Sequence, residues 1–159
     1  MGTPAGPAPL GPAVPQGPVM IRVQKILYPT DFSSPSTLAY FHALGLAEAY
    51  KAGLTVLHVH TPGGPDAPDK RAAQAQLESV HPANPSIAVR HALREGDAAA
   101  EIVKYAADMG ADVIVLGTHG RTGVDRLVLG SVAERVVRDA PCSVLVVKLP
   151  KGGAGQPPG

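Results

Sequence analysis

The sequence is poor in aromatic residues and has almost no cysteine. It contains no tryptophan, 2 phenylalanines, 4 tyrosines and 1 cysteine in 159 residues. So few aromatic rings argue against a stacking platform for single-stranded nucleic acid. One cysteine excludes an intramolecular disulfide and fits a reducing compartment, so we expect a cytoplasmic protein. Cys142 precedes an apolar run, and we interpret it as a buried structural thiol, with a reactive thiol as the alternative.

The chain also lacks an excess of positive or negative charge. The chain carries 14 Lys and Arg against 13 Asp and Glu, a formal net charge of +1. This balance gives no electrostatic reason to expect nucleic acid or an acidic membrane as the partner. No apolar run approaches the roughly 18 residues that span a bilayer, and the N-terminus does not resemble a secretory signal. We therefore expect a protein that acts away from membranes and nucleic acid.

Proline and glycine, by contrast, are abundant, and they concentrate at the two ends of the chain. Residues 1–19 form a Pro/Gly/Ala tract without charge or apolar periodicity, and residues 150–159 are similar. Such segments bury too little surface to offset the entropy of ordering, so we expect a disordered or polyproline-like arm and a disordered tail. The folded domain is then residues 20–149.

Strand-like and helix-like patterns alternate within this domain. Apolar runs predict strands, and segments with helical spacing or helix caps predict helices. The expected strands are 25–29, 54–60, 86–93, 112–117 and 143–148, and the expected helices are 33–52 (ended by Gly53), 69–80, 96–111 and 125–140. This order predicts an α/β fold: a three-layer, open, five-stranded parallel sheet with helices on both faces.

Open parallel sheets bind ligands at the carboxyl ends of their strands, where the strand order reverses. The segments expected there are YPTD, HVHTP and LGTHG, which end the first, second and fourth strands. The last of these contains Gly117 and Gly120, and Gly130 and Ser131 follow further on. Glycines near a helix start allow backbone amides to hold an anion, but they also make tight strand-to-helix connections. The spacing matches neither the P-loop nor the dinucleotide-binding fingerprint.

The segment GTHGRTGVDRLVLGS reads as Gly-x-x-Gly, nine residues, then Gly-Ser. It resembles the ATP-binding signature of the universal stress protein family. The segments KILYPTDFSSPS, LTVLHVH and GSVAERVVRDAPCSVLVVK resemble other parts of the same family. The resemblance covers roughly residues 23–149. It implies a fold like that of the adenine nucleotide alpha hydrolases, a Rossmann-like arrangement, and a dimer formed through the last strand.

The resemblance also implies a site for ATP, with Mg²⁺ carried by the phosphates. Asp31 matches the acidic residue that contacts the nucleoside, and Val59 matches the backbone position beside adenine. Glycines and a serine match the phosphate-binding positions. The full candidate site adds their neighbours and comprises Pro29, Thr30, Asp31, Val59, Gly117, Thr118, His119, Gly120, Arg121, Gly130, Ser131 and Val132.

Several of these residues have simpler alternative roles. Asp31 follows a strand end, where it can accept from ribose hydroxyls or make an Asx turn and cap the next helix, and Thr30 can assist in either role. His119 can donate to a phosphate or fill a turn. Arg121 can neutralise phosphate charge or be a solvated loop side chain. His58 and His60 share a strand face, which is weak evidence for a metal without a third ligand.

Three classes of protein remain open. The first is a nucleotide-binding stress-response or signalling module, the second a slow ATPase or nucleotidyl-transfer enzyme, and the third a dimerising scaffold of the same fold without nucleotide. Phosphoryl transfer requires a positioned base and cationic clamps. The sequence has no P-loop lysine and no paired carboxylates near the glycines, so we identify no catalytic residue and favour the first class.

Overall fold

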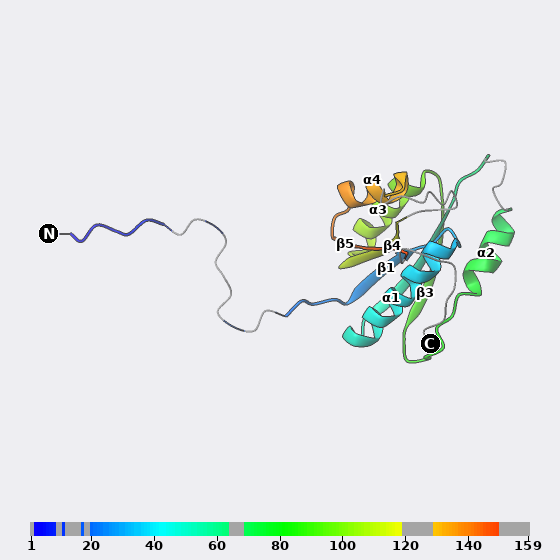
Figure 1. Cartoon of the computed structure of the whole chain (residues 1–159), viewed down its shortest axis with the longest axis horizontal. Coiled ribbons are helices and arrows are strands. Elements are labelled where there is room, and N and C mark those ends of the chain that lie inside the picture. Colours follow the sequence, from blue (N-terminus) through cyan, green and yellow to red (C-terminus); the bar gives the residue numbers. More distant parts are fainter. Residues whose placement is uncertain are drawn as a thin grey trace.

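A computed structural model describes residues 2–8, 11, 17, 20–63, 69–118 and 129–149. Within these ranges strands and helices alternate along the chain (Figure 1). The strands are β1 (Lys25–Pro29), β2 (Gly53–His60), β3 (Val89–Glu95), β4 (Val113–Gly117) and β5 (Ser143–Val147). The helices are α1 (Ser34–Tyr50), α2 (Lys70–Glu78), α3 (Ala98–Met109) and α4 (Ser131–Asp139).

The strands form one parallel five-stranded sheet in the order β3-β2-β1-β4-β5. Ile26 of β1 pairs with Leu54 on one side and with Val113 on the other. The strand order therefore reverses between β1 and β4, which is the topological switch point of a doubly wound sheet. The predicted fold class is confirmed.

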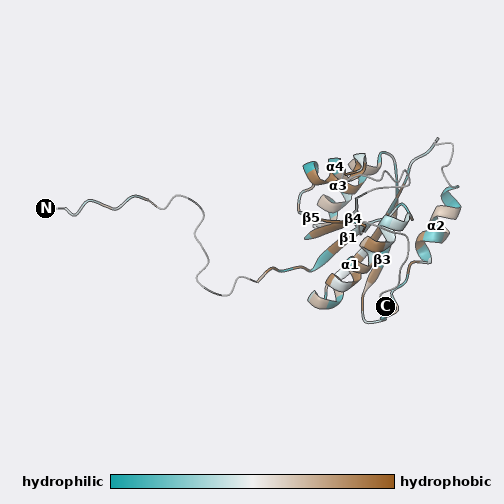
Figure 2. Ribbon diagram, in the orientation of Figure 1, coloured by the Kyte–Doolittle hydropathy of each residue, from teal (hydrophilic) through white to brown (hydrophobic). Residues whose placement is uncertain are grey.

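Two apolar cores lie on opposite faces of the sheet and make the protein three layers thick. Alternating residues of β1 divide between them, because successive strand side chains point to opposite faces. Ile26 and Tyr28 join the core that contains α1 and α2 residues, whereas Leu27 joins the core that contains α3 and α4 residues. Figure 2 shows hydrophobic residues in β5 and in much of α1, whereas α2 is largely hydrophilic.

Helix α1 begins as the sequence predicts but ends differently. The Ser33 hydroxyl caps its start by accepting from the backbone of Ser36, and Pro35 lies in the first turn. The predicted stop at Gly53 is wrong, because Lys51 takes the left-handed C-cap conformation (φ 53°) and Gly53 is already the first residue of β2. Because β2 begins at Gly53, α1 has to end before it, and the chain turns at Lys51 and Ala52.

The remaining boundaries shift by a few residues. The third strand was expected at 86–93 but is Val89–Glu95, because Asn84 accepts hydrogen bonds from both the backbone and the hydroxyl of Ser86 and forms a turn there. The predicted helix at 125–140 is also too long: α4 begins only at Ser131, and residues 125–128 lie outside the described residues. The helix at 96–111 is confirmed as α3, with Gly110 (φ 65°) at its end.

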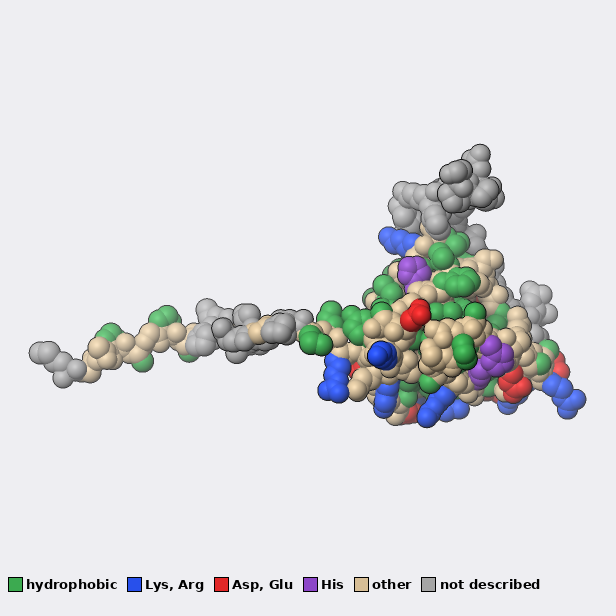
Figure 3. All heavy atoms as spheres, turned by 90° about the horizontal axis from the view of Figure 1, so that it is seen from below, with side chains coloured by type: hydrophobic (Ala, Val, Ile, Leu, Met, Phe, Trp, Pro, Cys, Tyr) green, Lys and Arg blue, Asp and Glu red, His purple; other side chains and the backbone are tan. Residues whose placement is uncertain are grey.

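Other expectations concern the ends and the surface. Residues 2–8 are exposed and contain no helix or strand, whereas the rest of the arm apart from residues 11 and 17 lies outside the described residues, as does the whole tail 150–159. Figure 3 shows basic side chains spread singly over one face of the molecule, with acidic ones between some of them. In the described part of the chain, no helix is both long and apolar enough to cross a membrane.

Candidate functional site

A cavity of about 340 Å³ lies at the carboxyl ends of β1 and β4, at the switch point of the sheet. Most of the predicted site residues meet there. Its lining comprises Pro29, Thr30, Asp31, Ser36, Ile102, Leu116, Gly117, Thr118, Gly130, Ser131, Val132, Ala133 and Val136. Val59 is not part of this lining and packs, partly buried, against the core below α3 and α4. His119, Gly120 and Arg121 lie outside the described residues.

The β1 side of the cavity is built on a buried hydroxyl network. The Thr30 hydroxyl oxygen accepts from the Ser36 hydroxyl at 2.8 Å and from the Phe32 backbone at 3.0 Å. Tyr28 donates to the Ser36 carbonyl at 2.7 Å. Burial raises the pKa of the Tyr28 phenol, against the opposing effect of its hydrogen bonds with Ser36, so the phenol remains a donor. Ser36 is thus a site residue that the sequence analysis missed.

Asp31 follows this network and lies partly exposed at the edge of the cavity. One carboxylate oxygen accepts from the Ser33 backbone at 3.0 Å, which is the Asx turn considered as an alternative role. A carboxylate has about four acceptor positions on its two oxygens. The turn therefore leaves Asp31 with capacity to accept further hydrogen bonds from a ligand.

Gly117 ends β4 and is required for a reason that the sequence did not reveal. A Cβ atom at this position would lie 2.8 Å from the Pro35 carbonyl oxygen and 2.9 Å from its carbonyl carbon. Contacts this short with backbone atoms cannot be relieved by moving a side chain. The glycine therefore lets the first turn of α1 approach the end of β4 and close one wall of the cavity.

The N-terminus of α4 forms another part of the cavity wall. Gly130 occupies the N-cap position, and no side chain caps the helix. The Gly130 amide donates to the Thr118 carbonyl at 2.6 Å, so this amide is already bonded within the protein. The next amides, from Ser131 to Ala133, belong to the first helical turn, whose N–H groups have no intrahelical acceptor. These residues line the cavity, so a partly positive helix end faces it.

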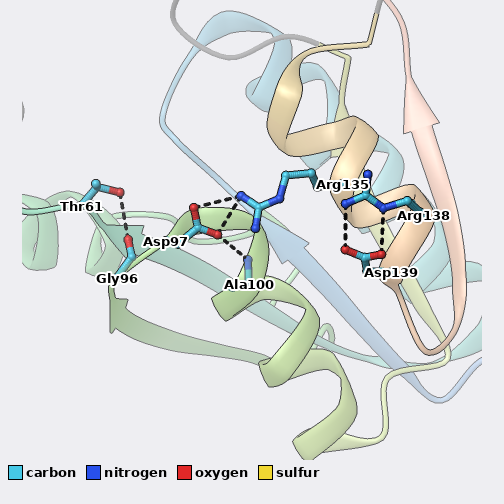
Figure 4. Close-up of polar contacts among 7 residues, drawn as sticks. All are labelled: Thr61, Gly96, Asp97, Ala100, Arg135, Arg138 and Asp139. Carbon is cyan, nitrogen blue, oxygen red and sulfur yellow. Dashed lines mark hydrogen bonds and ion pairs between the residues drawn. The ribbon is translucent and has the colours of Figure 1, made fainter.

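An ion pair joins helix α4 to the N-cap of helix α3. Figure 4 shows Arg135 of α4 reaching Asp97, which caps α3 by accepting from the Ala100 backbone at 2.9 Å. One guanidinium nitrogen lies 2.9 Å from each carboxylate oxygen. The hydrogen bond from Arg135, and then that from Ala100, hold the pKa of the Asp97 carboxyl below its ordinary value. No sequence pattern predicts the ion pair between Asp97 and Arg135, because the two residues are 38 positions apart.

The floor of the cavity is apolar and comes from several elements. It consists of Ile102 of α3, Leu116 of β4, and Ala133 and Val136 of α4. Leu116 belongs to the buried part of β4, and the two α4 residues lie on the buried side of that helix. The spacing of apolar residues in the helices and in the strand could have identified these residues as part of the apolar core. It could not have identified them as part of a ligand cavity.

Two other sequence features lie away from the cavity lining. His58 is buried and its Nδ1 atom lies 2.8 Å from the Thr30 carbonyl oxygen, while His60 is partly exposed. Within the described ranges, no group of three or more His, Cys, Asp or Glu side chains could hold a metal ion. Cys142 is half-buried against the core below α3 and α4, and burial raises the pKa of its thiol, as expected of a structural cysteine.

The fold and the cavity define a doubly wound α/β protein whose candidate site lies at the switch point of its sheet. The profile of the Universal stress protein family matches residues 22–148, and the chain belongs to this family. A universal stress protein of Methanocaldococcus jannaschii is 38% identical over 142 residues, covering 80% of this chain and 84% of the relative.

Solved structures of the same family share the fold. Universal stress protein UspA from Lactobacillus plantarum is 26% identical, with a TM-score of 0.66, over 79% of this chain and 98% of that chain. A universal stress protein described in complex with cAMP is also 26% identical, with a TM-score of 0.63, over 80% of this chain and 98% of that chain. The family and the fold predicted from the sequence are therefore confirmed.

Proposed function

We propose that this protein binds ATP in the cavity between β1 and β4 and acts as a nucleotide-dependent module in a stress response or signalling. One observation carries the proposal. Asp31 and the first turn of α4, which has no side-chain cap, line the same cavity. A carboxylate is suited to ribose hydroxyls and a helix N-terminus to phosphate, so the two ends of a nucleotide each find a matching group.

The size and chemistry of the cavity fit this ligand. Its volume of about 340 Å³ lies at the lower end of the range for small-molecule sites, and its floor is apolar. In the proposed arrangement, Gly117, Thr118, Ser131 and Val132 surround the phosphates, and the backbone near Val59 borders the adenine. A related structure is described as a complex with cAMP, which supports an adenine nucleotide.

We propose binding without rapid turnover. No lysine or arginine is present among the described residues that line the cavity, and Asp31 is the one carboxylate among them. A fast phosphoryl transfer needs cationic groups on the leaving phosphate and a base beside the nucleophile. Mg²⁺ bound to the phosphates would neutralise part of their charge, and the protein would hold the nucleotide through backbone amides and Ser131.

We also propose that the protein is a cytoplasmic homodimer that pairs through β5. This strand is at the edge of the five-stranded sheet and carries an exposed Leu145. An exposed edge presents unpaired backbone groups that a second copy can satisfy. The single cysteine of the sequence supports the location.

The test is to purify the protein, identify any co-purifying nucleotide, and measure ATP binding with Mg²⁺ by calorimetry. We expect micromolar affinity for the wild type and its loss in Gly130→Glu, which places a negative charge at the helix end. Gly45→Glu is the matched control, because a Cβ at that exposed position of α1 meets nothing within 4 Å. Equal affinity in Gly130→Glu and Gly45→Glu would contradict the proposal.

A further inference from the structure

The turn that carries Asp31 has an unusual backbone. Phe32, the next residue, has φ 63°, in the left-handed region that side chains other than glycine, asparagine and aspartate rarely adopt. Its backbone N–H donates to the Thr30 hydroxyl oxygen at 3.0 Å. A bulky residue in this conformation persists where the surrounding structure holds it in place, and such positions concentrate at functional sites.

His58 at the end of β2 holds this turn in two ways. Its Nδ1 atom lies 2.8 Å from the Thr30 carbonyl oxygen, and its ring stacks on Phe32 with centroids 4.6 Å apart and planes inclined by 30°. A carbonyl oxygen can only accept, so Nδ1 carries the hydrogen and donates it. One buried side chain thus binds the residue before Asp31 and the residue after it.

The other contacts of Thr30 make the turn rigid on its inner side. Its N–H donates to the Leu57 carbonyl at 2.8 Å, and its hydroxyl oxygen accepts from Ser36 at 2.8 Å. With the His58 bond to its carbonyl, each polar atom of this buried residue has a partner. The turn that carries the Asp31 carboxylate is therefore already ordered before a ligand binds, which reduces the entropy cost of binding.

We propose that His58 is a positioning residue for the nucleoside half of the site: by fixing Thr30 and Phe32 it sets the place of the Asp31 carboxylate. This inference rests on the proposed function. The α4 N-terminus has attachments of its own on the β5 side of the sheet, so we expect the nucleoside side and the phosphate side to respond differently to a change at His58. Gly130 is bonded to Thr118, and the Thr118 backbone is bonded to Val147 of β5 at 3.1 Å.

The experiment compares His58→Leu with His58→Asn. Leucine removes the donor, whereas the side-chain amide of asparagine places an N–H close to where Nδ1 was. Calorimetry measures the affinity of each protein for Mg-ATP, adenosine and tripolyphosphate, and thermal unfolding checks that each is folded. We expect His58→Leu to weaken ATP and adenosine by about tenfold, the equivalent of one lost hydrogen bond, and to leave tripolyphosphate unchanged. We expect His58→Asn to recover most of the loss.

A second readout separates positioning from general stability. The Ser33 amide donates to Asp31, so its NMR resonance reports the geometry of the turn. It should move in His58→Leu and return toward the wild-type position in His58→Asn. Equal loss in both variants, or loss of tripolyphosphate binding in step with adenosine, overturns the inference.

The proposed function can fail in a different way. If the wild type binds neither ATP nor adenosine, the nucleotide site itself is wrong and the inference falls with it. If Asp31→Ala weakens ATP binding while His58→Leu binds as the wild type does, the nucleotide site stands and the role of His58 is wrong.

Discussion

Arg135 and Asp97 join two helices through an ion pair in which one guanidinium nitrogen lies 2.9 Å from each carboxylate oxygen. Asp97 also caps α3, so the pair ties the start of one helix to the middle of α4. The N-terminus of α4 faces the cavity. The contact is therefore one of the attachments that position the helix end to which we assign the phosphates.

Arg135→Gln should weaken the binding of ATP by disturbing the contacts with the ATP phosphates. The contacts with the nucleoside should be unchanged. Both partners are substantially exposed, with 43% and 55% of their side-chain surface accessible, so the pair contributes little free energy in water. We expect a loss of ATP affinity of about two- to fivefold with adenosine affinity unchanged. Calorimetry at low and at high salt checks this, because salt screens an exposed pair and should shrink the difference.

Arg138→Gln is the matched control for Arg135→Gln. Arg138 is on the same helix and is paired at 3.0 Å with Asp139, its neighbour in sequence, so it joins no second element. Asp97→Asn offers a second check, since asparagine still caps α3 but carries no charge. Equal effects of the two arginine variants would show that the contact with α3 does not position α4.

Gly117→Ala should destabilise the protein. The added Cβ would meet the Pro35 backbone at 2.8 Å, and forcing extra atoms into a packed contact costs about 1–3 kcal/mol of unfolding free energy. Gly45→Ala, at an open position within α1, should instead stabilise by about 0.5–1 kcal/mol because alanine favours helix. Urea denaturation followed by circular dichroism measures both, and stability changes of the same sign would contradict the packing argument.

Asp112 should make stability depend on pH. Its Oδ2 atom accepts from the backbone of Gln24 at 2.8 Å and of Lys25 at 2.9 Å, and these bonds hold the pKa of the carboxyl below its ordinary value of 3.8. The carboxylate therefore stabilises the fold above pH 3.8, and this contribution is lost as pH falls through the depressed pKa. Asp112→Ala should be less stable than the wild type at neutral pH, and the two should converge in acid. A difference that stays constant with pH would contradict this.

Leu145→Glu should shift the proposed dimer toward monomer. Leu145 is 38% exposed on the edge strand β5, and a second copy paired along this edge would bring two new carboxylates together. Phe41→Glu is the control, because Phe41 is 63% exposed on α1 and is not part of the edge strand. Sedimentation velocity measures the oligomeric state of the wild type and of the two variants. Dissociation by Phe41→Glu alone would place the interface on α1.

The sequence predicted the order of the elements because helical and strand-like spacing follows directly from burial on one face. It also placed Asp31 and Ser131 at one cavity, since strand ends of a parallel sheet meet at one edge. It missed the Lys51 cap, because lysine rarely takes the left-handed conformation and sequence signals for a helix end favour glycine there. It could not reveal that Gly117 faces Pro35, or that Arg135 meets Asp97, since both contacts depend on how helices pack.

The hydrogen bond from Gly130 to Thr118 brings together two residues that are 12 positions apart, at the place where the chain leaves β4 and enters α4. This one bond fastens the first turn of α4 to the carboxyl end of β4, so the two elements that contribute residues to the cavity meet at a single backbone contact.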